Sequence, residues 1–440
     1  MSSLNRRAPV EKVTNLVGVA VPKISVGSQL TRLVLANMLW EDQFYIDGKS
    51  NAELIKDLVA KADPTFVELL AETARKQFKL RHVPLLLARE LARKGKLRAD
   101  ALNAVIQRPD EMSEFLSLYW KEGKTPISNQ VKKGLTKAFG KFNAYQLAKW
   151  DKNSAAISMR DVMFLTHPKP INQEQAILFN KIANNQLETP DTWETNLSAG
   201  ADKKETFERL MAEGKLGALA FLRNLRNMVE SGISESVIRT YSVNLDVSKV
   251  LPFRYIAAAR VVPQFEDMLE QMMFKSLSTY EKLPGKTKLY VDVSSSMYTP
   301  KVSAKSDLTR QDASLALAML LREVCEDIEI YSFSGKALRI APRRGFALAE
   351  AIKTSQVCSG TNLQASLEQT KSNADRVICI TDEMTYGHST FSPPYGGAKG
   401  YMLNVAAYQN GINNGNWLTI TGFSEAVVDY IMQFEKLQNS

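Results

Sequence analysis

One acidic and two hydroxyl side chains alternate at Asp292, Ser294 and Ser296, directly after the apolar run 289–291. The apolar run predicts a buried strand, whose end can offer one carboxylate and two hydroxyls to a common point. Oxygen-only ligands of this kind suit a hard divalent cation such as magnesium. Alternatively, Asp292 and Ser294 cap the start of a helix by accepting hydrogen bonds from its free N–H groups.

Two later segments add donors of the same kind. Thr361 follows Gly360 in a short polar loop, and Asp382 ends the apolar run 377–381. The three segments show the pattern of the von Willebrand factor A fold, and the donors resemble the metal-ion-dependent adhesion site of that family at Asp292, Ser294, Ser296, Thr361 and Asp382. The resemblance implies a divalent ion, expected to be Mg²⁺, with a position open to an acidic partner. In the alternative, the ion is purely structural or absent.

The segments around these donors alternate in type. Strand patterns cover residues 288–293, 328–333, 376–381, 401–407 and 417–421, and helical patterns cover 312–325, 346–354, 363–371 and 424–437. Such alternation predicts a doubly wound α/β sheet with a site at the carboxyl ends of its strands. We therefore expect a von Willebrand factor A-like domain over residues 286–440.

The preceding part of the chain has a helical pattern. Asp63 and Pro64 form a good helix start, and apolar residues recur at helical spacing after them. Short helices with one apolar face and no strand between them predict a HEAT-like α-solenoid over residues 1–285. The chain is thus expected to be a two-part α and α/β protein.

Charge is distributed unevenly between the two parts. Residues 1–286 contain 42 Lys and Arg against 32 Asp and Glu, whereas residues 287–440 contain 14 against 15. The helical part is therefore the candidate polyanion binder. The alternative is that its basic residues lie on solvated helix faces and bind no polyanion.

Several classes of protein are disfavoured by the sequence. No apolar run approaches the roughly 20 residues that cross a bilayer, and no signal segment is present, so a cytoplasmic protein without a membrane partner is expected. The P-loop pattern is incomplete at both Gly-Lys-Ser/Thr tripeptides, and the histidines are scattered at His82, His167 and His388. We expect no enzymatic activity.

Three tracts of the helical part resemble the Ro ribonucleoprotein family, namely residues 160–170, 217–228 and 251–258. The resemblance implies a TROVE module, in which HEAT-like helices close into a ring, joined to a von Willebrand factor A domain. It further implies that the outer surface binds small structured Y-like RNA and that the hole takes single-stranded 3′ ends of misfolded RNA. A monomer is expected.

The resemblance also places RNA contacts on particular residues. The candidates for structured RNA are Lys132, Lys133, Lys137, Lys141, Lys149, Lys152, Arg160 and His167. Trp150 and Tyr145 could stack on unpaired bases, but a core or helix-packing role is favoured for both, and His167 could simply cap a helix end. A second basic tract, Arg75, Lys76, Lys79 and Arg81, lines the hole or is a solvated face.

Two functional hypotheses remain. In the first, the protein binds noncoding RNA for RNA quality control or brings RNA to a ribonuclease, which could dock through an acidic ligand at the metal. In the second, it is a metal-dependent scaffold for protein interactions without RNA binding. Strongly salt-dependent RNA affinity favours the first hypothesis.

Overall fold

The computed structural model of the chain forms two compact units. The first contains residues 1–51, 217–226 and 234–440, and the second contains residues 52–216 and 227–233. The residues that the structure describes are 12–14, 20–22, 25–35, 45–46, 49–77, 79–151, 156–248, 250, 252–278, 280–298, 308–357, 360–382, 397–405, 417–421, 427–428, 430–432 and 435. The secondary structure changes from helices to strands close to the predicted boundary at residue 286, whereas the compact units divide the chain elsewhere.

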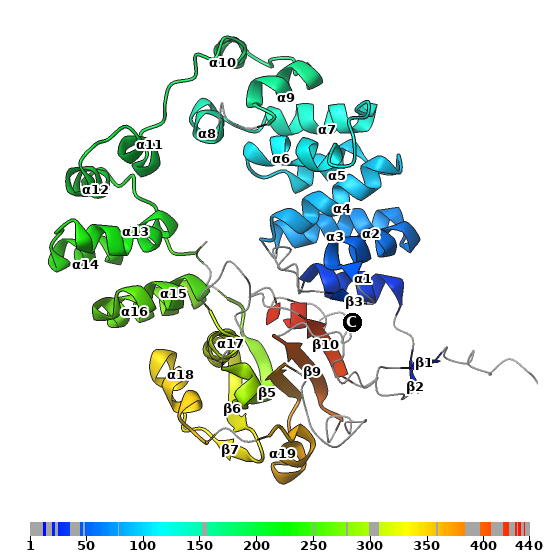
Figure 1. The fold of residues 1–440 in the computed structure, drawn as a ribbon, viewed down its shortest axis with the longest axis vertical. Coiled ribbons are helices and arrows are strands. Elements are labelled where there is room, and N and C mark those ends of the chain that lie inside the picture. Colours follow the sequence, from blue (N-terminus) through cyan, green and yellow to red (C-terminus); the bar gives the residue numbers. More distant parts are fainter. Residues whose placement is uncertain are drawn as a thin grey trace, which may run out of the picture. The chain divides into compact units, whose positions relative to one another are not determined.

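Most of the second unit consists of short helices (Figure 1). They are α2 (Asn51–Lys61), α3 (Pro64–Lys76), α4 (His82–Arg93), α5 (Ala99–Val105), α6 (Asp110–Tyr119), α7 (Asn129–Phe139), α8 (Ala144–Trp150), α9 (Met159–Thr166), α10 (Gln173–Ala183), α11 (Trp193–Ser198) and α12 (Lys203–Ala212). Asp63 caps α3 as predicted, by accepting a hydrogen bond of 2.9 Å from the N–H of Phe66.

These helices stack in two rows. Helices α3, α5, α7 and α9 pack successively on one another, and α4 packs on α6 in a second row. The close approach of α7 to α5 depends on Gly134, because a Cβ atom there would lie 2.9 Å from the carbonyl oxygen of Ala99. The predicted HEAT-like array is confirmed by this arrangement.

The first unit begins with α1 (Val26–Leu35) and the short strands β1 (Lys12–Thr14), β2 (Ala20–Pro22), β3 (Tyr45–Ile46) and β4 (Lys49–Ser50). It continues with α14 (Glu235–Val243), α15 (Phe253–Val261) and α16 (Glu266–Leu277). Helix α13 (Ala218–Glu230) contributes residues to both units. No helix within the described residues is long and apolar enough to cross a bilayer.

A six-stranded sheet forms the rest of the first unit, in the order β10-β9-β8-β5-β6-β7. Its strands are β5 (Leu283–Asp292), β6 (Cys325–Phe333), β7 (Ala337–Arg339), β8 (Arg376–Thr381), β9 (Lys399–Asn404) and β10 (Trp417–Thr421). All neighbouring pairs are parallel except β6 and β7. The doubly wound sheet is thus confirmed, and the antiparallel edge strand β7 is an addition that the sequence analysis missed.

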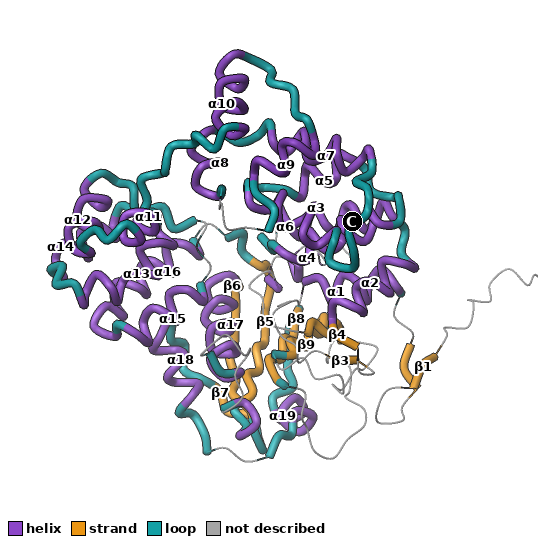
Figure 2. Tube along the Cα trace, turned by 45° about the horizontal axis from the view of Figure 1, so that its top comes forward, coloured by secondary structure: helices purple, strands orange, loops and turns teal. Residues whose placement is uncertain are grey.

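Helices cover the sheet (Figure 2). Helix α17 (Arg310–Val324) packs on β5 and β6, and α18 (Gly345–Lys353) packs on α17. Helix α19 (Leu363–Gln369) contributes Leu363 and Leu367 to a core that includes Tyr290 and Cys379 of the sheet. The predicted strand 401–407 and helix 424–437 extend partly into residues outside the described ranges.

A buried ion pair joins the sheet to a distant residue. Arg376, on β8, donates a hydrogen bond of 2.8 Å to Glu435 and forms an ion pair with it. The Arg376 guanidinium also donates to the Thr287 hydroxyl at 2.8 Å, and the Tyr401 hydroxyl donates to Glu435 at 2.8 Å. Strands β8 and β9 are therefore tied directly to one carboxylate, and β5 is connected to it through Arg376.

Candidate metal centre and basic surface

The predicted metal donors lie at the carboxyl edge of the sheet. Asp292 is the last residue of β5, and Asp382 directly follows β8, the parallel neighbour of β5. Strand β5 is flanked by β6 on one side and β8 on the other, so the chain winds away from it in both directions. This point of reversal is where open α/β sheets bind their ligands.

Hydrogen bonds hold the first loop in a defined shape. The Ser294 N–H donates to Oδ1 of Asp292 at 2.8 Å, and the Thr381 hydroxyl donates to Oδ2 of Asp292 at 2.6 Å. The hydroxyl oxygens of Ser294 and Ser296 lie 3.1 Å apart. Thr381 was not among the predicted site residues, although its position just before Asp382 in the apolar run was a usable signal.

The second loop is anchored beside the first. The N–H of Asn362 donates to the carbonyl oxygen of Ser334 at 2.8 Å, and the Ser334 hydroxyl donates to the carbonyl oxygen of Gly360 at 3.2 Å. Ser334 follows Phe333, which is the register partner of Asp292. The buried Thr361 is thereby placed at the same edge of the sheet as the other donors.

Burial dominates the electrostatics of this site. Asp292 and Asp382 are fully buried, and burial, with a smaller contribution from Asp382, raises the pKa of Asp292 to about 6. The nearest cation to Asp382 that the structure records is Arg310, whose Nη1 lies 3.6 Å from Oδ2. Among the described residues, two buried carboxylates and one guanidinium contribute a net negative charge to the site.

The donor set fits a hard divalent cation. Two carboxylates and three hydroxyls offer only oxygen ligands, which are those that Mg²⁺ prefers. Among the described residues no group of three or more His, Cys, Asp or Glu side chains could hold a metal ion. The chemistry of the site therefore depends on serine and threonine hydroxyls. Asp292 also accepts the Ser294 N–H just before the short 3₁₀ helix Ser295–Met297, so the capping alternative stays open.

Most of the predicted basic residues of α7 and α9 are exposed. Lys132 and Lys133 on α7, Arg160 on α9 and His167 after α9 all face solvent. The hydroxyl of Thr136 donates to the carbonyl oxygen of Thr166 at 3.2 Å, so the middle of α7 lies beside the end of α9. Among the described residues, no ion pair involves Lys132, Lys133 or Arg160, so their charges are available to phosphates.

Exposed aromatic rings accompany these cations. Tyr145 is 52% exposed and Phe164 is 51% exposed. The Lys149 ammonium lies 6.0 Å from the Tyr145 ring, and the Arg160 guanidinium lies 5.3 Å from the Phe164 ring. Tyr145 is thus not a core residue, and both rings could stack on unpaired bases. Trp150 is half-buried, with the Arg108 guanidinium 3.8 Å from its ring centroid.

Two lysines of the predicted set make internal contacts. The Lys141 ammonium donates hydrogen bonds to the carbonyl oxygens of Asn103 and Ile106 at the end of α5, and burial lowers its pKa to about 8. Lys137 forms an ion pair of 2.5 Å with Asp100. These contacts join α7 to α5, which gives both residues a structural role.

The remaining members of the set differ in placement. His167 has φ of 50° at the end of α9, and its N–H donates to the carbonyl oxygen of Met163 at 2.8 Å, so it caps the helix as the alternative anticipated. Lys152 lies outside the described residues.

The second basic tract is tied to acidic residues of α6. Arg75 forms an ion pair of 2.5 Å with Glu111, and Arg81 contacts Asp110 at 2.6 Å and also pairs with Glu114. Lys76 pairs with Glu72 on its own helix, and the ammonium of Lys79 donates to the carbonyl oxygen of Lys76 at 2.5 Å. The tract is therefore neither a simple solvated face nor an unpaired row of cations.

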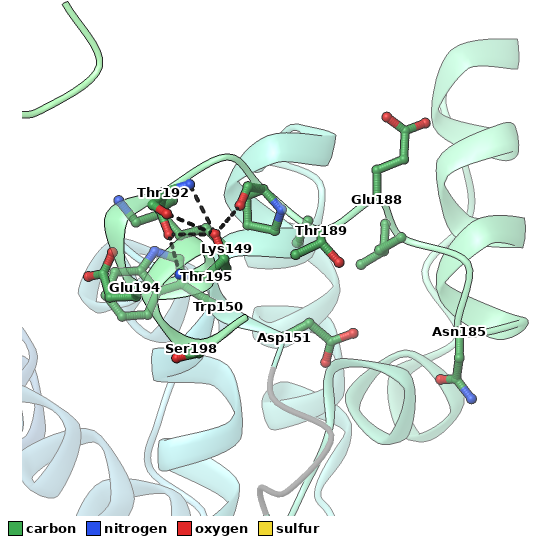
Figure 3. Close-up of a pocket in the computed structure, with 13 residues that line it drawn as sticks. Lys149, Trp150, Asp151, Asn185, Glu188, Thr189, Thr192, Glu194, Thr195 and Ser198 are labelled. Atoms are coloured by element: carbon green, nitrogen blue, oxygen red, sulfur yellow. Dashed lines mark hydrogen bonds between the residues drawn. The ribbon is translucent and has the colours of Figure 1, made fainter. Parts of the chain in front are cut away.

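A pocket of about 400 Å³ adjoins Lys149 and Trp150 (Figure 3). Its other walls come from the loop after α10 and from α11, where hydrogen bonds join Thr195 to Thr192 and Pro190. The lining also includes the carboxylates of Asp151, Glu188 and Glu194. With three acids against one lysine, this pocket is not suited to a phosphate group.

Comparison with known proteins agrees with this geometry. Residues 183–323 match the TROVE domain. The chain is 36% identical over 90 residues to "Telomerase protein component 1" of Mus musculus and 32% identical over 110 residues to that of Rattus norvegicus. These matches cover 19% and 24% of this chain but only 3% and 4% of the two relatives, so the chain spans a small part of their length.

A solved structure resembles almost the whole chain. The crystal structure of the Deinococcus radiodurans RO (RSR) protein has a TM-score of 0.65 to this structure, with 18% sequence identity, and the match covers 93% of this chain and 99% of that one. Together these findings confirm the predicted resemblance to the Ro family. The chain therefore carries a TROVE-domain match over residues 183–323 and has the fold of the Deinococcus radiodurans RO (RSR) protein.

Proposed function

We propose that the protein binds small structured, Y-like noncoding RNA through the basic surface of α7 and α9, meaning Lys132, Lys133 and Arg160. The observation that carries this proposal is the exposure of these three cations, one of which, Arg160, lies 5.3 Å from the exposed Phe164 ring. Lysine and arginine release counterions when they neutralise phosphates, and the ring offers a stacking platform. Shape and unpaired bases are recognised by such a surface more readily than sequence.

The family resemblance supports a second RNA site, for single-stranded 3′ ends of misfolded RNA. A protein with both sites would serve RNA quality control or hold RNA for a ribonuclease. Because Arg75 and Arg81 are paired with carboxylates of α6, they contribute less to such a site than the exposed Lys76 and Lys79. We also propose that the protein is cytoplasmic and monomeric.

Direct titration tests the RNA proposal. The nuclease-treated protein is titrated with a stem-loop RNA and with an RNA that ends in a free single-stranded 3′ tail, each at two salt concentrations. We expect affinity for the stem-loop to fall with salt by a log–log slope of roughly 0.9 for each phosphate contact. Failure to bind either RNA would leave a metal-dependent protein scaffold as the function.

We further propose that the carboxyl edge of the sheet holds Mg²⁺. Ser294 and Ser296 would bind the ion directly, and Asp292, Thr361 and Asp382 would bind it directly or through water. The support is that the Ser294 and Ser296 hydroxyls converge and that Asp292 is oriented by Ser294 and Thr381. The bound ion would supply an electrophilic position for an acidic ligand from a partner protein, such as a ribonuclease.

Magnesium should stabilise the folded protein. At a Mg²⁺ concentration one hundred times its Kd, linkage gives about 2.7 kcal/mol, which thermal unfolding detects as a rise in Tm. Asp292→Ala and Ser294→Ala should each abolish this rise while sparing RNA binding. Asp327→Ala, which removes an exposed carboxylate of β6, is the matched control and should keep it. No change in the Tm of the wild-type protein on addition of Mg²⁺ would contradict the proposal.

A further inference from the structure

An arginine outside the proposed ligand set lies against the metal site. Arg310 is the first residue of α17 and is only 8% exposed. Its guanidinium, 3.6 Å from Oδ2 of the fully buried Asp382, already offsets part of the negative charge there. A helix N-terminus carries additional partial positive charge, which acts in the same direction.

The turn of helix that carries Arg310 is fixed in place. Thr309 and Asp312 form a capping box, and the Ser314 hydroxyl donates to the carbonyl oxygen of Arg310 at 3.0 Å. Asp312 also forms an ion pair with Arg260, on α15. Because the backbone on both sides of Arg310 is held and its side chain is buried, the guanidinium is kept close to Asp382.

Charge decides what this arrangement favours. Among the described residues, Asp292, Asp382 and Arg310 together contribute one net negative charge, which a divalent ion turns into one net positive charge. A buried site with uncompensated charge is costly, and an anionic ligand on the ion restores neutrality. A site of the same donors without Arg310 would be neutral with the ion alone.

We propose that Arg310 competes with the divalent ion for Asp382, so that the ion binds tightly only together with a carboxylate ligand. This inference rests on the metal site proposed above. It makes Arg310 a positioning and selectivity residue, which touches one ligand of the ion and is not itself a ligand. The fraction of protein with Mg²⁺ bound then depends on the presence of an acidic partner as well as on the Mg²⁺ concentration.

Calorimetric titration of the full chain with MgCl₂ tests the inference. Arg310→Gln should bind Mg²⁺ at least about tenfold more tightly than wild type, because a nearby like charge is removed. Arg310→Lys, which keeps the charge, should remain close to wild type. Arg322→Gln removes a charge from the far end of the same helix, about 18 Å away at 1.5 Å per residue, and should bind like wild type.

A second arm adds a carboxylate probe to the same titrations. Acetate, used as the carboxylate probe at constant ionic strength, should raise the Mg²⁺ affinity of the wild-type protein at least threefold and that of Arg310→Gln much less. Equal Mg²⁺ affinities for wild type and Arg310→Gln, or no acetate effect on wild type, would overturn the role of Arg310 while leaving the metal site intact. Absence of Mg²⁺ binding by every protein would overturn the metal site itself.

Discussion

Glu435→Gln should lower the free energy of unfolding of the sheet by about 3–5 kcal/mol, the range for breaking a buried ion pair by removing one partner. The substitution leaves the Arg376 guanidinium buried without a countercharge and weakens the hydrogen bond from Tyr401. Chemical unfolding followed by tryptophan fluorescence measures the loss. Since Trp417 packs in the sheet core, it reports on this part of the chain.

An exposed ion pair provides the control. Glu188→Gln breaks the ion pair with Lys181, in which both side chains are exposed to solvent. It should lower the free energy of unfolding by less than about 1 kcal/mol. In the double variant Glu435→Gln with Arg376→Met, part of the loss should be recovered, because no unpaired charge stays buried. A loss for Glu435→Gln as small as that for Glu188→Gln would mean that the buried pair does not hold the sheet.

Charge reversal on the basic surface should have the second large effect. The triple variant Lys132→Glu, Lys133→Glu and Arg160→Glu should bind the stem-loop RNA about a hundredfold or more weakly at low salt. Its salt slope should fall by roughly 0.9 for each phosphate contact that is lost. Fluorescence anisotropy at several salt concentrations gives both quantities.

A second triple variant separates local contacts from net charge. Lys181→Glu, Lys203→Glu and Lys204→Glu change the charge of the helical array by the same amount at α10 and α12. This control should lose only a few-fold in affinity. If the first triple variant weakened a short single strand as much as the stem-loop, a separate site for structured RNA would be ruled out.

The placement of two proposed metal donors could be predicted, because Asp292 ends one recognisable strand and Asp382 directly follows another. Apolar runs end at Asp292 and at Asp382, and parallel strands bring their carboxyl ends to one edge. The spacing of Thr361 carried less information, since its position depends on Ser334 and the end of β6. Periodicity likewise predicted the helical array, because each short helix buries a single face.

Contacts between distant residues could not be predicted in the same way. The pairing of Arg81 with Asp110 and the hydrogen bonds from Lys141 to the end of α5 depend on how helices stack. The sequence shows only that these residues are basic. Arg310 gave no signal either, since its contact with Asp382 arises from the packing of α17 on the sheet. The short strand β7 was missed because three residues carry too little pattern.

The separation of contacts along the chain sets an order of assembly. Thr381 and Asp292, which shape the metal site, are 89 residues apart, and Arg376 and Glu435 are 59 apart. The ties between α7 and α5 span fewer than 40 residues. Local contacts form faster than distant ones, and the N-terminal parts of a chain fold first during synthesis. The growing polypeptide therefore completes the proposed RNA-binding surface before the proposed metal site, so RNA would be able to bind before a metal-dependent partner.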